Sequence, residues 1–208
     1  MSKTNKLFLL LFVLSVALYT CRTVPTSYNS STDSFAGHDR AQAKTTPATG
    51  NPQVVATITE LLQIIPSDAA FISSGITRSS KRTIIEQKNY TVTNAFLYGI
   101  SHESDNDFHL ILGDSLGNNF MNAEASGLPA SNSPAYTTLN DVRNNIKKTI
   151  GIQFLSQRGY TVFKVPKKIT VTGSLFFDAD HAPGVVGFGK CKPNTSVEIH
   201  PIIDFSLR

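Results

Sequence analysis

The chain has 208 residues, of which 40% are hydrophobic and 16% are charged, so it can bury an apolar core and is not disordered throughout. Only two cysteines are present, which excludes a disulfide-rich scaffold and a zinc cluster built on cysteines. The formal charge is +4 and becomes +2 if Lys3 and Lys6 are removed with a signal segment, an excess too small to predict an anionic partner.

The N-terminus has the pattern of an export signal. Residues 1–6 are short and basic, and residues 7–19 form a 13-residue apolar run. This run is too short to span a bilayer, which needs about 20 residues. Cys21 follows in a Leu-Tyr-Thr-Cys sequence that resembles a bacterial lipoprotein signal. We therefore expect residues 1–21 to be a signal peptide and the protein to be exported, either lipidated at Cys21 and membrane-anchored, or cleaved and released as a secreted or periplasmic protein.

Two further segments precede the main domain. Residues 22–52 are rich in Ser, Thr, Pro, Ala and Gly and hold almost no large aliphatic side chains, so their composition predicts a disordered tether. Residues 53–82 are expected to be a helical extension. Its apolar side chains recur at helical spacing up to Pro66, and a basic, loop-like stretch over residues 73–82 ends it.

Residues 83–208 have the pattern of a mainly β domain. β-Branched and aromatic residues predict strands, and one segment with helical periodicity interrupts them. In this segment Leu139, Val142, Ile146 and Ile150 form one apolar stripe, and Gly151 ends it. Gly173 is expected at a bulge or bend of its strand. In chain order the expected elements are strands over 83–101, 107–113 and 120–126, a helix over 137–150, and strands over 168–178 and 196–206.

This order predicts an OB-fold-like Greek-key β-barrel of five strands. Three strands, a helix and two more strands are the connectivity of that fold, in which the helix lies between strands 3 and 4. The helix of residues 53–82 is then an N-terminal extension of the barrel domain. No internal repeat with a period of 20–50 residues is visible.

Four strings carry a resemblance to known sequences: Phe96-Leu97-Tyr98-Gly99, Asp105-Asn106-Asp107-Phe108-His109-Leu110, Gly173-Ser174-Leu175-Phe176-Phe177-Asp178 with His181, and Glu198-Ile199-His200-Pro201. Together they resemble a family of uncharacterised bacterial, mostly exported, OB-fold-like proteins. The resemblance covers roughly residues 90–207. It implies the barrel fold and export, and it implies no assigned activity.

Acidic and imidazole side chains are placed where three strands of such a barrel meet. Asp107 and His109 share one strand face, Glu198 and His200 share a face of the last strand, and Glu124 is the only acid of the strand that lies between them. Carboxylates and imidazoles together suit a divalent metal or acid–base chemistry. The alternative is structural: polar residues on a solvated barrel face, with His–carboxylate pairs that pin strands together.

A second group lies at a strand end, where Asp178, Asp180 and His181 are candidate metal ligands. No compact metal motif such as HExxH is present. A divalent metal is therefore a candidate cofactor, and none is assigned with certainty.

Three local motifs are better explained by turns and loops. Residues 113–117 match a nucleophile elbow, but a strand pattern follows them where that motif needs a helix. Residues 184–190 match part of a phosphate-binding loop, but Cys191 replaces the Ser or Thr, and Pro193 prevents the helix that should follow. Cys191 lies between two lysines without a neighbouring histidine, so catalysis by its thiol is not expected.

These observations favour an exported, monomeric binding or interaction module without catalytic activity, whose ligand or protein partner the sequence does not identify. The alternative is a metal-dependent hydrolase of the phosphodiesterase or nuclease kind that uses the His and carboxylate group. OB-folds can bind single-stranded nucleic acid. Nucleic acid is nevertheless not the expected partner, because an exported protein is separated from most intracellular nucleic acid. Contact with a membrane is expected only through a lipid on Cys21.

Overall fold

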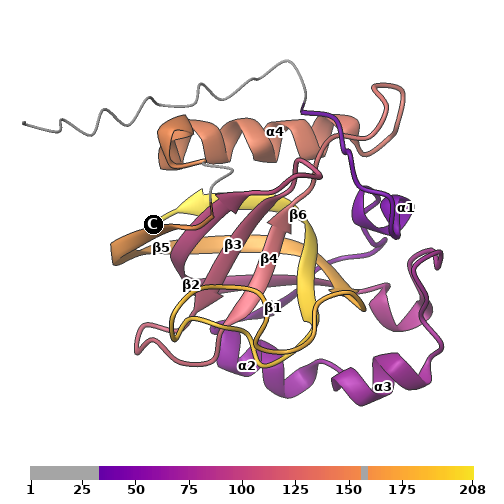
Figure 1. The fold of residues 1–208 in the computed structure, drawn as a ribbon, viewed down its shortest axis with the longest axis horizontal. Helices are drawn as coiled ribbons and strands as arrows, with labels where there is room; N and C mark the ends of the chain where they lie inside the picture. The colour runs from indigo at the N-terminus through magenta and orange to yellow at the C-terminus, as the bar shows by residue number, and fades with distance from the viewer. Residues whose placement is uncertain (1–32, 156–158) are drawn as a thin grey trace, which may run out of the picture.

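The structure is a computed structural model that describes residues 33–155 and 159–208 (Figure 1). Its centre is a closed barrel of five strands in the order β2–β3–β4–β6–β5, in which β5 pairs back with β2. β4 and β6 run parallel, and the other neighbours in the barrel are antiparallel. The mainly β barrel of five strands predicted from the sequence is confirmed. Its strands are β2 (Asn89–His102), β3 (Phe108–Gly113), β4 (Met121–Ala125), β5 (Thr161–Phe177) and β6 (Val197–Leu207).

The barrel encloses one apolar core because side chains alternate along each strand. In β3, Phe108, Leu110 and Leu112 belong to this core together with Ala123 of β4 and Ile199 of β6. Successive side chains of a strand point to opposite faces. The residues between these core positions therefore lie on the outer face of the barrel, and that face carries the candidate site.

A helix connects the third and fourth strands of the barrel along the chain. α4 (Tyr136–Ile146) follows β4 and precedes β5, and a π-helical turn over Lys147–Gly151 continues it. The predicted stripe is buried at Leu139, Val142, Ile146 and Ile150. α4 packs against β6, on the opposite side of the barrel from the short helices α2 (Ile58–Ile64) and α3 (Asp68–Ser73) (Figure 1).

The extension differs from the single helix expected over its first half. Gln53–Val55 form a short strand, β1, which pairs in parallel with β2. Two short helices follow, α2 (Ile58–Ile64) and α3 (Asp68–Ser73). β-Branched Val54 and Val55 favour the strand, and the side chain of Thr57 starts α2 by accepting a hydrogen bond from the Glu60 amide.

Residues 33–52, the second part of the segment expected to be a tether, are folded against the barrel. They include α1 (Ala41–Lys44) and the buried Arg40. The Arg40 guanidinium donates to both carboxylate oxygens of Glu86, at 2.8 and 2.6 Å, and to the Phe177 carbonyl at 2.8 Å. The prediction of a disordered tether is therefore wrong for residues 33–52. Hydrogen bonds to buried groups hold this segment on the barrel, and a scarcity of apolar side chains does not reveal them.

Two strand predictions need small adjustments. A 3-10 turn over Ile84–Glu86 precedes β2, so this strand begins later than expected. The strand expected over 168–178 begins earlier, at Thr161, and β5 runs through Pro166. The pairing of β5 with β6 shifts at Gly173, which confirms the expected irregularity. A Cβ at Gly173 would lie 2.4 Å from the Ile199 side chain, so a close contact between strands requires glycine there.

In the part of the chain that the structure describes, no helix is long and apolar enough to cross a bilayer. The expected signal segment and Cys21 lie outside the described residues.

Candidate functional site

The strand register brings the predicted site residues together on the outer face of the barrel. His109 of β3 lies opposite Glu124 of β4. β4 and β6 run parallel with Ala123 beside Ile199, so the residues next to these two, Glu124 and His200, also become neighbours. Asp107 comes directly before β3. We call Asp107, His109, Glu124, Glu198 and His200 the buried ionisable cluster.

The members of the cluster are within contact distance of one another. Nε2 of His109 lies 2.8 Å from Oε1 of Glu124. Nδ1 of His200 lies 2.9 Å from Oε2 of Glu124 and 3.1 Å from Oε1 of Glu198. Nε2 of His200 lies 3.5 Å from Oδ2 of Asp107. His200 is therefore the centre of the cluster, with carboxylates on both sides of its ring.

This face of the barrel is not solvated. The exposed fraction is 0% for Asp107, Glu124 and His200, 3% for Glu198 and 6% for His109. Burial of so many ionisable groups costs free energy that hydrogen bonds and opposite charges must offset. The prediction that these polar residues lie on a solvated face of the barrel is therefore wrong.

The N-terminal segment contributes to this burial. The ring of Phe176, on β5, lies 5.2 Å from the ring of His200, centroid to centroid. Arg40 lies over the Phe176 ring at 4.4 Å, and the Lys44 ammonium lies 5.9 Å from the ring centre. Residues 40–44 therefore lie over the ring that packs against His200.

Several atoms of the cluster are held in place by neighbours. Asn122, two residues before Glu124 on the same face of β4, donates to Oε1 of Glu124 at 2.6 Å and to Oε2 of Glu198 at 2.8 Å. The Gly127 amide donates to Oδ1 of Asp107 at 2.6 Å. Three members of the cluster each keep an atom without a hydrogen-bond partner, Oδ2 of Asp107, Oε2 of Glu124 and Nε2 of His200, and so does the neighbouring Asn122 at its Oδ1.

Burial and mutual charge shift the pKa values of the cluster in opposite directions. Burial acts to lower the pKa of the imidazoles, but the Glu124 carboxylate outweighs it and raises the pKa of His109 to about 9 and of His200 to about 10. Burial acts to raise the pKa of Glu124, but the two imidazoles hold it well below its usual range. Burial raises the pKa of Asp107 to about 7, against the opposing charge of His200. At neutral pH the imidazoles therefore hold protons that Glu124 stabilises.

Of the second predicted group, the structure keeps two members beside the cluster and separates the third. Nδ1 of His181 lies 2.8 Å from Oδ2 of Asp178, and the His181 ring centre lies 6.4 Å from that of His109. Asp180 instead pairs with Arg78 at 2.7 Å. Asp178 and His181 are therefore adjacent to the cluster, and Asp180 is not part of it.

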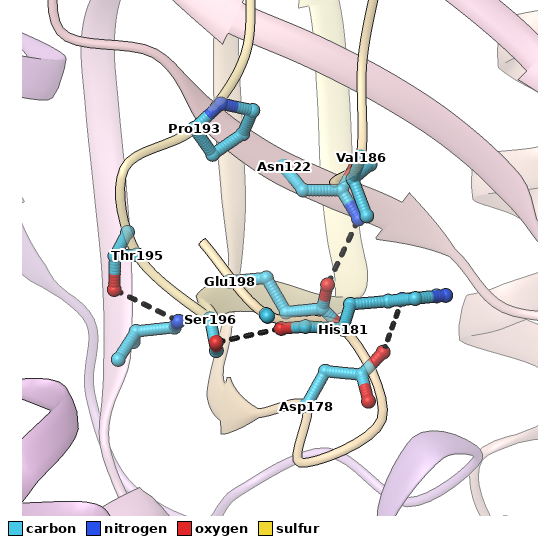
Figure 2. A pocket seen from close by; sticks show the side chains of 10 residues that line it. Asn122, Asp178, His181, Val186, Pro193, Thr195, Ser196 and Glu198 are labelled. Carbon is cyan, nitrogen blue, oxygen red and sulfur yellow. Dashed lines mark hydrogen bonds and ion pairs between the residues drawn. The ribbon is translucent and has the colours of Figure 1, made fainter. Parts of the chain in front are cut away.

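A small pocket adjoins the cluster (Figure 2). Asn122 and Glu198 belong both to its wall and to the hydrogen bonds of the cluster, and Asp178 and His181 form another part of the wall. Its volume is about 10 Å³, which accommodates one water molecule or one ion. The remaining lining comes from the connection between β5 and β6: Ala182, Val186, Pro193, Thr195, Ser196 and Val197.

The geometry of the buried group is compatible with a metal ion. Asp107, Glu124 and His200 each offer one ligand atom, and these atoms lie within 4.8 Å of one another. Two carboxylate oxygens and one imidazole nitrogen form a donor set that divalent cations accept. The buried group could therefore bind a metal.

Sequence reasoning missed Asn122, Lys44 and Phe176. Asn122 could have been found because it precedes Glu124 by two residues and therefore shares its strand face. Lys44 gave no such signal because it lies in a segment of low complexity. Its pKa is raised because the carboxylates of the cluster, Glu124 first, outweigh the effect of burial.

The motifs that were set aside lie in turns and loops. Gly113–Gly117 connect β3 to β4 through a turn in which the Gly117 amide donates to the Asp114 carbonyl at 3.0 Å. The Asp114 side chain accepts a hydrogen bond from the Ile58 amide at the start of α2. The connection from β5 to β6 contains Cys191, which is half-buried, and burial raises the pKa of its thiol.

The chain matches no protein-family model, no curated protein and no solved structure at significant similarity.

Proposed function

We propose that this protein is an exported binding module of the OB type, without catalytic activity, whose ligand is a small cation held at the buried ionisable cluster. The strand order, the parallel contact of β4 with β6 and the helix between β4 and β5 support the OB type. The short basic start and the 13-residue apolar run support export, with Cys21 as the candidate lipid anchor.

The observation that carries the binding function is the convergence of five buried ionisable groups outside the apolar core. A barrel of this size is already closed by the apolar side chains of its five strands. The cluster adds buried charge that a stable fold does not need, and residues with strongly shifted pKa values beside a pocket are candidates for a functional site.

The charge of the site favours a cation. Four carboxylates lie in or beside the cluster, those of Asp107, Glu124, Glu198 and Asp178. Most of the balancing positive charge is carried by protons on imidazoles, which can leave when another cation arrives. A cation therefore replaces protons without leaving a buried charge unpaired.

The proposal is tested by thermal unfolding with a panel of probes: Zn²⁺, Mn²⁺, Ca²⁺, methylammonium and guanidinium. At 100 times its dissociation constant a bound cation stabilises the fold by about 2.7 kcal/mol, which raises the unfolding temperature by about 5–10 °C. We expect at least one probe to do so with the wild type and with Asp180→Asn, and the effect to fall in Glu198→Gln. No shift with any probe, or an equal shift in Glu198→Gln, contradicts the proposal.

A second candidate is a metal-dependent hydrolase, and the pocket beside the cluster favours it. Asn122 and Glu198 place this pocket directly against the group that could hold a divalent metal. Asp178 and His181, paired at 2.8 Å, are positioned on its wall for proton transfer. Hydrolysis of a generic phosphodiester with added Zn²⁺ or Mn²⁺, abolished by His181→Gln, would establish this candidate over the plain module.

A further inference from the structure

We propose that Asp107, Glu124 and His200 are a site for one first-row divalent transition-metal ion, with His109 and Asn122 as positioning residues. This inference rests on the proposed binding function and names the cation that the cluster takes. The three candidate ligands come from the segment before β3, from β4 and from β6.

The pattern of satisfied and unsatisfied atoms carries the assignment. Each of the three side chains has one atom fixed by a neighbour and a second atom left without a hydrogen bond. In Asp107, Oδ1 accepts a hydrogen bond from the Gly127 amide, and Oδ2 has no hydrogen-bond partner. In His200, Nδ1 lies 3.1 Å from Oε1 of Glu198, and Nε2 has no hydrogen-bond partner.

Glu124 follows the same pattern. Its Oε1 lies 2.6 Å from the Asn122 amide nitrogen and 2.8 Å from Nε2 of His109, and its Oε2 accepts no hydrogen bond, although Nδ1 of His200 lies 2.9 Å away. Metal ligands are typically oriented in this way, through the atom that does not bind the ion. Buried polar atoms rarely remain without a hydrogen bond, so these three atoms, together with Oδ1 of the neighbouring Asn122, point to a small ligand at the cluster.

The spacing between Asp107 and His200 fits two ligands of one metal ion rather than a direct contact. Two ligand atoms each about 2.1 Å from a tetrahedral ion lie about 3.4 Å apart. The distance between Oδ2 of Asp107 and Nε2 of His200 is 3.5 Å. This is longer than a good hydrogen bond between nitrogen and a carboxylate oxygen, at about 2.7–2.9 Å, and it matches the edge of a metal tetrahedron.

The donor set selects the class of ion. Ca²⁺ takes six to eight oxygen ligands, and Mg²⁺ keeps several waters, so neither suits a buried site with an imidazole ligand. Zn²⁺, Mn²⁺, Fe²⁺ and Co²⁺ accept mixed oxygen and nitrogen ligands. Two carboxylates and a neutral imidazole also balance the charge of a divalent ion.

The adjoining pocket supplies access. Glu198 lines the pocket and also contacts His200, so the pocket reaches the cluster through this side chain. The pocket accommodates one water-sized species next to the site.

The direct test is a calorimetric titration of the chelator-treated full chain with Zn²⁺ and Mn²⁺, backed by elemental analysis after dialysis. We expect one equivalent of one of these ions. Asp107→Asn and His200→Gln should each weaken binding by at least about 100-fold, and His109→Gln by about 10–100-fold through Glu124. Asp180→Asn, which removes an acid paired with Arg78 outside the cluster, should bind as the wild type does.

A second measurement begins with the wild type, for which no folded variant is needed. Co²⁺ added to the wild type should give the strong visible absorption of a low-coordinate site, and it should shift or broaden the imidazole resonances of His200 and His109. His109→Gln should change this spectrum, whereas a purely structural role of His109 would leave it unaltered.

Each outcome decides between the two proposals. Absence of stoichiometric metal in the wild type, or binding that persists in both Asp107→Asn and His200→Gln, overturns the metal site. If an organic cation still stabilises the wild type and fails to stabilise Glu198→Gln, the binding module stands and only the metal assignment is lost. If no cation of either kind binds, both proposals are overturned.

Discussion

Replacement of Arg40 by methionine should destabilise the protein strongly, although Arg40 lies in a segment whose composition predicts disorder. The guanidinium forms an ion pair with Glu86 at 2.6 Å, and the Glu86 side chain is 0% exposed. Removing one partner of a buried pair typically costs about 3–5 kcal/mol, because the other charge remains buried without its partner. Glu86 keeps three donors, the Thr83 amide, the Thr83 hydroxyl and the Phe177 amide, so we place the loss near 3 kcal/mol, at the lower end of that range.

The assay is urea unfolding of the wild type, Arg40→Met and the double variant Arg40→Met/Glu86→Leu. The single variant should lose about 3 kcal/mol, which lowers the unfolding temperature by about 6–12 °C. The double variant should recover part of the loss, because no unpaired carboxylate remains buried. A loss below about 1 kcal/mol in Arg40→Met would refute the reasoning, since it would mean that residues 33–52 do not pack on the barrel as the structure has them.

Three other predictions follow from the same structure. Burial acts to raise the pKa of Glu86, but Arg40 holds it below its ordinary value of 4.5. The pair therefore stabilises the fold above pH 4.5, and this stabilisation is lost as the pH falls through the lower pKa of the folded state. In acid unfolding monitored by circular dichroism, the stability of Arg40→Met/Glu86→Leu should fall less steeply with pH than that of the wild type. Leu110→Ala, at a fully buried core position, should cost about 2–5 kcal/mol in urea unfolding, whereas Leu116→Ala, at a side chain that is 87% exposed, should change stability by less than about 0.5 kcal/mol. Mass spectrometry of the mature N-terminus should show a lipid on Cys21 or a new free terminus, and an intact first methionine would rule out export.

The barrel was predictable because its strands have strong local signals. Alternation over β3 and the apolar stripe of α4 locate these elements to within a few residues. Period-2 and period-3.6 patterns are set by which side chains face the core, so they are visible in the sequence. The short elements β1, α2 and α3 were merged in the prediction because each spans at most seven residues and the apolar periodicity continues across their boundaries.

The positions of the site residues on their strands were predictable, and their environment was not. Strand parity places His109, Glu124 and His200 on the outer face, and the strand order of the barrel brings them together. Their burial depends on the N-terminal segment and on the connection between β5 and β6. Those parts pack through Arg40, Lys44 and backbone hydrogen bonds, for which no periodic pattern exists in the sequence.

The parallel neighbours β4 and β6 have a consequence for when the site can first exist. Glu124 and His200 are 2.9 Å apart in the folded chain, but the helix, the longest strand and a loop separate them in sequence. Contacts between such distant positions form late, after the entropy of closing the intervening loop has been overcome. A chain under synthesis therefore cannot assemble the proposed site until its final strand has been added, so capture of a cation would report that the barrel is complete.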